Sequence, residues 1–246
     1  MLLSHHKGHT EEALKSSNMS TEAAKQVAIG CTANDLCEFT NEGQMFITSK
    51  DVAYRTFGTR AAIFGSIAIY QSHFGDLASM HAMANACGDS PQRTKNEVMA
   101  WFQFLNGLAL GTISIDPNAK IGSDNVPISS MFANHNIEYD QILDTEDSFE
   151  IKNRALGMMC HLIQDAYTYS HCERGADNEI RKFYCYQPQD KQKHKDGDHV
   201  ISGYEEVLQK QCKICVEIIG RGIEYDCSQI LHLSHDAKNS DGGIFV

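Results

Sequence analysis

The residues best suited to chemistry lie in one short segment, from His161 to His171. Asp165 stands four residues after the first histidine, and the second histidine follows six residues later. At about 100° per residue, His161 and Asp165 share one face of a helix, whereas His171 is rotated to the side if the helix continues. The two oxygens of a carboxylate can each bind a cation, and zinc accepts neutral imidazoles as ligands. The segment therefore indicates a metal site in which Asp165 bridges two ions.

Further histidines and carboxylates extend this pattern. His194 and Asp198 repeat the spacing of four, and His73 precedes Asp76 by three residues. Near the N-terminus stand three more candidates: His5, His6 and His9. The chain has 12 histidines in all, and their grouping with carboxylates favours a multinuclear metal site over ordinary surface histidines.

The spacings resemble those of the zinc-dependent phospholipase C and fungal single-strand nuclease superfamily. These all-helical enzymes hold three zinc ions with an H-x3-D-x5-H segment followed by H-x3-[D/E]. This sequence reproduces both elements, as His161, Asp165, His171 and then His194, Asp198. Ser72-His73-Phe74 is similar to an earlier ligand segment of the family, and with the stretch from Ala155 to Asp165 it favours the bacterial phospholipase C branch.

The resemblance implies two or three zinc ions and assigns their ligands. One site would comprise His73, His161, Asp165 and an upstream carboxylate, and another would comprise His171, His194 and Asp198. Asp51 is our candidate for the upstream carboxylate, with Asp76 as a competitor. Asp165 would also reach an ion near His6, for which His5 and His9 compete, and His199 could replace one member of the last pair.

Two positions depart from the family pattern. Family members begin with a tryptophan that binds one zinc ion, whereas this chain begins Met1-Leu2-Leu3 and its single tryptophan is Trp101. Thr59 stands where the family has a carboxylate, some fourteen residues before the histidine of Ser72-His73-Phe74. The first departure puts the third zinc ion in question.

The implied chemistry is hydrolysis of a phosphodiester. Paired metal ions roughly 3.5 to 4 Å apart lower the pKa of a bridging water toward about 7 and stabilise the leaving alkoxide. Asp51 and Asp165 are the expected catalytic carboxylates, and no protein nucleophile is needed. We expect a phospholipase C that hydrolyses phosphatidylcholine-type glycerophospholipids at a membrane surface to diacylglycerol and a phosphorylated head group. The alternatives are a zinc-dependent single-strand nuclease and a non-catalytic helical zinc-binding interaction protein.

Other residues receive simpler interpretations. His81 is expected to be a structural histidine, and Arg174 is expected in a surface salt bridge rather than on a phosphate. Cys212-Lys-Ile-Cys215 has the spacing of a redox or zinc motif but lies in a periodic helical segment, so we interpret it as core.

Composition limits the class of protein. The chain has 246 residues, a formal net charge of -11 and 42% hydrophobic residues, which favours a single globular domain over residues 1–246. No segment approaches the roughly 20 apolar residues of a transmembrane helix. The acidic balance opposes binding to duplex nucleic acid.

The elements expected to position the ligands are helices. Periodic apolar residues and the absence of sustained alternation predict an all-α, multi-helix bundle. The expected helices span residues 20–38, 59–70, 76–86, 93–110, 147–169, 202–221 and 225–233, with an irregular stretch over 111–146. Nine scattered cysteines favour reduced thiols, and no secretory leader is recognisable. These features favour a protein that stays inside the cell, whereas the resemblance implies export. We therefore expect a bacterial protein delivered outside the cell by a route without a cleaved leader, with the cytoplasm as the alternative.

Overall fold

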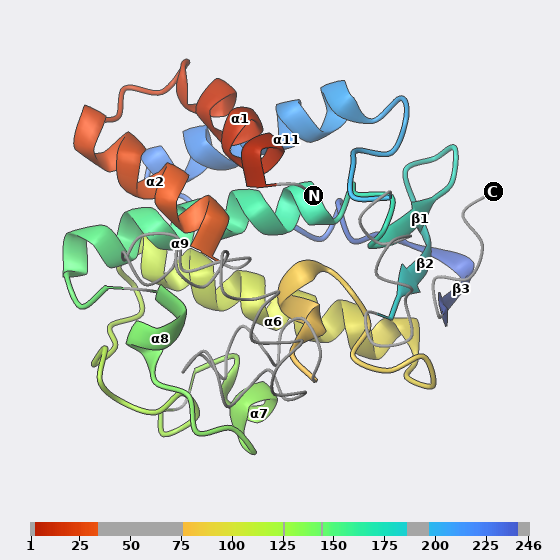
Figure 1. Cartoon of the computed structure of the whole chain (residues 1–246), viewed down its shortest axis with the longest axis horizontal. Helices are drawn as coiled ribbons and strands as arrows, with labels where there is room; N and C mark the ends of the chain where they lie inside the picture. The colour runs from red at the N-terminus through yellow and green to blue at the C-terminus, as the bar shows by residue number, and fades with distance from the viewer. Residues whose placement is uncertain (1–2, 34–75, 125, 144, 186–196, 241–246) are drawn as a thin grey trace, which may run out of the picture.

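A computed structural model describes residues 3–33, 76–124, 126–143, 145–185 and 197–240 (Figure 1). In chain order the helical elements are α1 (Leu3–Leu14), α2 (Thr21–Ala33), the 3-10 turn η1 (Ala78–His81), α6 (Pro91–Leu110), α7 (Ser129–Phe132), α8 (Tyr139–Leu143), α9 (Ser148–Asp165) and α11 (Glu205–Gly220). The strands are β1 (Cys172–Arg174), β2 (Ile180–Tyr184) and β3 (Leu233–Ser240).

Helix α9 runs through the middle of the molecule. In Figure 1, α1, α2 and α11 lie on one side of it, α6 lies on the other, and the strands gather near its C-terminal end. Every residue from Ala155 to Asp165 is buried. Residues on all sides of α9 are therefore shielded from water, including the polar ones at its C-terminal end.

Local signals explain where the two longest helices begin. Asp147 accepts hydrogen bonds from the backbone N–H groups of Phe149 and Glu150, which caps α9. Ser90 caps α6 in the same way, and Pro91 occupies the first helical position. Gly111 ends α6 in the left-handed conformation, with φ at 72°. These starts agree with the sequence prediction to within a few residues.

The prediction of an all-α fold is wrong, because the structure contains a three-stranded mixed sheet in the order β1-β2-β3. Strand β1 pairs antiparallel with β2, and β2 pairs parallel with β3. The strands are short or polar, and β2 buries Ile180, Phe183 and Tyr184 without clean alternation. A strand of this kind is stabilised by its partners rather than by its own pattern, so period-two alternation could not reveal it.

Other helix boundaries also differ from expectation. The expected helix over 225–233 is wrong, because residues 225–232 form irregular and turn structure and Leu233 begins β3. The expected helix over 76–86 is reduced to η1, because Ala82 adopts a left-handed conformation with φ at 53°. The expected helix over 59–70 lies outside the described residues. Helix α1 was not anticipated, and the irregular region 111–146 contains the short helices α7 and α8.

Cys87 and Cys185 form a disulfide, which corrects the expectation that the thiols are reduced. Beside it, the backbone N–H of Ala84 donates to the carbonyl oxygen of Tyr184 at 2.9 Å. The segment that follows His81 is thereby held against the sheet. Six other cysteines in the described part of the chain are buried free thiols, including Cys212 and Cys215, which fits their interpretation as core.

Two glycines allow α2 and α9 to pack with their backbones in contact. A Cβ atom at Gly157 would collide with the carbonyl oxygen of Val27 and would come within 2.5 Å of the backbone nitrogen of Cys31. A Cβ atom at Gly30 would collide with the backbone of Arg154. This contact sets the distance between Cys31 on α2 and the polar residues at the end of α9.

We predict that Gly157→Ala lowers the free energy of unfolding by about 1–3 kcal/mol or more, because an added atom in a close-packed contact forces the backbones apart. The matched control is Gly8→Ala in α1, where a Cβ atom would meet nothing within 4 Å. The control should be neutral or gain about 0.5–1 kcal/mol from helix propensity. Chemical denaturation of both variants measures the difference, and a wild-type stability for Gly157→Ala would contradict the close contact.

Candidate metal centre

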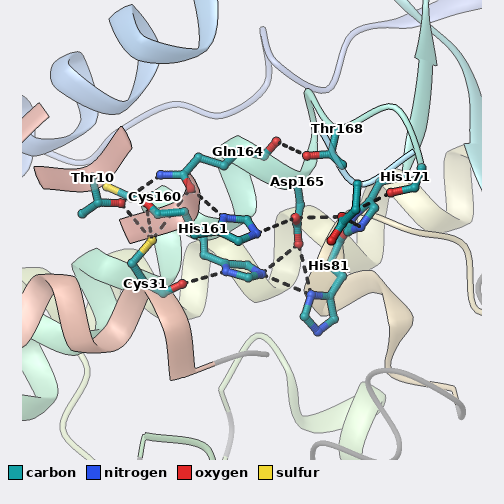
Figure 2. Close-up of polar contacts among 12 residues, drawn as sticks. Thr10, Cys31, His81, Cys160, His161, Gln164, Asp165, Thr168 and His171 are labelled. Atoms are coloured by element: carbon teal, nitrogen blue, oxygen red, sulfur yellow. Dashed lines mark hydrogen bonds and ion pairs between the residues drawn. The ribbon is translucent and has the colours of Figure 1, made fainter. Parts of the chain in front are cut away.

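Asp165, the last residue of α9, is a fully buried carboxylate surrounded by four histidines (Figure 2). Its Oδ2 lies 2.8 Å from Nε2 of His161 and 3.1 Å from Nδ1 of His81. Its Oδ1 lies 3.4 Å from Nε2 of His6 and 3.5 Å from Nδ1 of His171. The histidines come from α1, η1, α9 and the turn before β1, so four separate segments meet at one carboxylate.

The end of α9 brings His171 back to Asp165. The sequence predicted a helix to residue 169, but the helix stops at Asp165 and the backbone N–H of Thr168 donates to the carbonyl oxygen of Asp165 at 2.9 Å. The N–H of His171 then donates to the carbonyl oxygen of Thr168 at 3.0 Å. These tight turns fold the chain so that His171 reaches the carboxylate, which a continuing helix would have prevented.

A buried arginine supports this turn. Arg174 Nε donates to the carbonyl oxygen of Ala166 at 2.7 Å, and the guanidinium lies 4.0 Å above the ring of Tyr167. Its other nitrogens donate to the carbonyl oxygens of Asn178 and Ile230. Arg174 is thus neither in a surface salt bridge nor directed at a substrate phosphate. It stabilises the exit from α9 through backbone carbonyl groups.

Hydrogen bonds assign the protonated nitrogen in three of the histidine rings. Nδ1 of His161 lies 2.7 Å from the carbonyl oxygen of Cys31, and Nδ1 of His171 lies 2.7 Å from that of His81. Nδ1 of His6 lies 2.6 Å from Oε1 of Gln164. Because an oxygen of this kind only accepts, each Nδ1 carries a proton, and in the neutral form of each ring the Nε2 keeps its lone pair.

The three Nε2 atoms with lone pairs face carboxylates. Those of His6 and His161 face Asp165, and that of His171 lies 3.8 Å from Oδ1 of Asp198. A nitrogen lone pair and a carboxylate oxygen do not attract one another. A cation would bind both the nitrogens and the carboxylate. This pairing of Nδ1–H with a carbonyl oxygen is also how proteins orient histidines that bind metals.

A second layer of polar groups fixes Gln164. Its Nε2 donates to Oγ1 of Thr10 at 2.9 Å, and that hydroxyl donates to Sγ of Cys31 at 2.8 Å (Figure 2). Because the amide nitrogen of Gln164 donates to Thr10, its amide oxygen accepts the hydrogen bond from His6. The orientation of the His6 ring therefore depends on a relay through α1, α2 and α9.

Electrostatics favours an ionised Asp165 and a neutral His6. Burial raises the pKa of Asp165, but His161 and then His171, in their protonated forms, lower it, and the pKa lies well below its ordinary value. Burial, followed by repulsion from His161, lowers the pKa of His6 to about 4. An ionised carboxylate and a neutral imidazole are the forms that bind a metal ion.

The predicted ligands fall into two groups. His6, His161, Asp165, His171 and Asp198 are described and lie together, with Oγ of Ser170 3.4 Å from Asp198. The calls on Asp51, His73 and His194 fall outside the described residues.

The competing candidates lie elsewhere. His5 is exposed, His9 binds Oε1 of Gln209 at 3.1 Å, and Asp76 pairs with His135. His199 stacks on Tyr169 with ring centroids 5.7 Å apart. None of these four contacts Asp165 in a hydrogen bond or ion pair that the described residues make.

Sequence reasoning missed His81 as a member of the cluster. Its Nδ1 lies 3.1 Å from Oδ2 of Asp165 and 3.2 Å from Nε2 of His161. No local spacing marked this histidine, because its position depends on the 3-10 turn and on the pairing of the next residues with β2. The sequence placed His81 in an expected helix over 76–86, where we interpreted it as a structural histidine.

The donor set fits a metal ion. Ligand atoms of His81, His161 and Asp165 lie within 4.8 Å of one another, and so do those of His6, Cys31 and His161. All five residues are buried. An isolated buried carboxylate is costly, and a cation coordinated by it and by neutral imidazoles removes that cost. Buried clusters of histidine, cysteine and aspartate in this protein could therefore hold a metal ion.

Comparisons of the chain with protein-family models, curated proteins and solved structures give no match. Within the described ranges, no helix combines the length and the apolar character needed to cross a bilayer.

The lowered pKa of His6 predicts a pH dependence of stability for the metal-free protein. The unfolded chain takes up a proton at His6 near pH 6.5, whereas the folded chain resists it until about pH 4. Stability should therefore fall as the pH falls through this window, with a contribution of at most about 1.4 kcal/mol per pH unit. Urea denaturation at several pH values measures the slope.

His6→Asn removes the titrating group and should flatten this slope. His5→Asn, at an exposed position of the same helix, is the matched control and should keep the wild-type slope. An equal slope in wild type and His6→Asn would show that His6 is not the buried neutral imidazole described above.

Proposed function

We propose that the protein is a zinc-dependent phosphodiester hydrolase, and that its substrates are glycerophospholipids. The observation that carries the proposal is the buried Asp165, with Nε2 lone pairs of His6 and His161 directed at its two oxygens at 3.4 and 2.8 Å. Zinc fits this set, because it accepts imidazole nitrogen and carboxylate oxygen in closed, buried sites.

The ligands divide between two positions. Asp165, with His6, His81 and His161, would hold one ion, and the resemblance adds His73 and Asp51. His171 and Asp198, joined by His194, would hold another. When bound, such ions lower the pKa of a water between them and stabilise the charge on the leaving oxygen.

The chain's own residues orient and protect this centre. The carbonyl oxygens of Cys31 and His81 fix the orientations of the rings of His161 and His171. Asp165 and His161 are fully buried, whereas the side chain of Asp198 is 14% exposed. The open side of the centre therefore lies toward Asp198, and a phosphodiester would approach from there.

Phospholipid is favoured over nucleic acid by charge. A formal net charge of -11 repels a polyanion, whereas a zwitterionic head group carries no net charge. The resemblance to the bacterial phospholipase C branch supports the same choice. We therefore propose a phospholipase C reaction on phosphatidylcholine-type lipids that releases diacylglycerol and a phosphorylated head group.

We predict that Asp165→Asn reduces hydrolysis of phosphatidylcholine vesicles by more than about 100-fold, because even the hydrogen-bond partners of metal ligands contribute roughly 10- to 100-fold. The amide keeps the size of the side chain but loses the charge that holds the ions. Asp177→Asn, at an exposed position, is the matched control and should retain full activity.

Single-stranded DNA assayed beside the vesicles tests the substrate class. Turnover of DNA alone would contradict the lipid assignment and support the nuclease alternative. Zinc binding without turnover of either substrate would contradict the enzyme and support a zinc-binding interaction protein.

A further inference from the structure

Cys31 of α2 places a sulfur atom close to His6 and His161, two of the histidines that face Asp165. Its side chain is fully buried, and its Sγ lies together with ligand atoms of His6 and His161 within 4.8 Å. We propose that His6, Cys31 and His161 form a separate metal position, in which the Cys31 thiolate replaces a carboxylate as the anionic ligand. This position does not depend on the phosphodiesterase assignment.

The geometry places this position on the opposite side of the rings from Asp165. Nε2 of His161 faces Asp165, whereas its Nδ1 lies 2.7 Å from the carbonyl oxygen of Cys31 itself. His6 is arranged in the same sense, because its Nε2 faces Asp165 and its Nδ1 faces Gln164. The two rings are stacked, with centroids 4.1 Å apart, and the Nε2 atoms of both face Asp165.

Further polar atoms surround the sulfur. The hydroxyl of Thr10 donates to Sγ of Cys31 at 2.8 Å, and Oε1 of Gln164 lies 3.9 Å from it. That oxygen is also 2.6 Å from Nδ1 of His6, so it is placed to complete a set of four donors. One thiolate, two imidazoles and an oxygen in a closed pocket resemble a structural zinc site rather than an open catalytic one.

The ligand chemistry selects the class of cation. Thiolate is a soft ligand, and a site containing it prefers zinc to magnesium, calcium or manganese. Because a neutral imidazole has one lone pair, an ion held by the Nδ1 atoms moves the ring protons to Nε2 and replaces the hydrogen bonds from Nδ1 to Gln164 and to the carbonyl oxygen of Cys31. The Cys31 thiol releases its proton to solvent when the thiolate binds the ion. The Nε2 of His161 would then donate a hydrogen bond to Asp165 across the observed 2.8 Å. An ion at Cys31 and an ion held by the same two rings at Asp165 are therefore alternatives.

Cobalt(II) provides the test, because it replaces zinc and reports a sulfur ligand. Cobalt(II) added to the metal-free protein under argon should produce a thiolate-to-metal charge-transfer band in the near ultraviolet. Cys31→Ser should lose this band. The matched control is Cys212→Ser, which removes another buried thiol, 3.8 Å from Nε2 of Gln164 and outside the proposed ligand set. That variant should keep the band.

Two results would overturn the proposal: cobalt binding by the wild type without the band, or an undiminished band in Cys31→Ser. If Cys31→Ser does not fold, X-ray absorption of the zinc-loaded wild type decides instead. A sulfur atom about 2.3 Å from zinc supports the position, and a shell of nitrogen and oxygen alone contradicts it.

The same titration separates this proposal from the proposed function. Cobalt bound by nitrogen and oxygen alone would refute the Cys31 position while leaving the Asp165 centre in place. A charge-transfer band in a wild-type protein that hydrolyses neither phosphatidylcholine nor single-stranded DNA would support the Cys31 position and refute the enzyme.

Discussion

The structure depends on one constraint, the burial of the Asp165 carboxylate at the end of the central helix. A buried charge is stable only with compensating partners, and here histidines from four segments supply them. The Nδ1–H groups of His161 and His171 donate to backbone carbonyl oxygens, which orients Nε2 of His161 toward Asp165 and Nε2 of His171 toward Asp198. The result is a pair of carboxylates that face histidine nitrogens, which is an arrangement suited to a cation.

The remainder of the fold brings these segments into position. The glycine contact between α2 and α9 sets the carbonyl group of Cys31 against His161, and Arg174 secures the turn that returns His171. The disulfide between Cys87 and Cys185 holds the segment after His81 against β2. The glycine contact, the Arg174 guanidinium and the disulfide thus each hold one side of the same cluster.

The sequence identified residues of the buried cluster better than it predicted the fold. The spacing of His161, Asp165 and His171 identified members of the cluster, because two of them share a helix and a carboxylate next to histidine is uncommon in a core. His81 could not be predicted, because it reaches Asp165 through a short 3-10 turn that tertiary contacts stabilise. The sheet was missed for a related reason: β1 has only three residues, and β3 is largely polar and is held by pairing with β2. Interactions distant in sequence decide such elements.

The proposed function rests on the claim that the histidines around Asp165 bind metal. Elemental mass spectrometry of protein purified without added zinc or chelators measures this most directly, as metal ions per chain. We predict two or three zinc ions per chain. A protein that contains no metal and takes up none when zinc is added would contradict the assignment of this cluster as a metal centre.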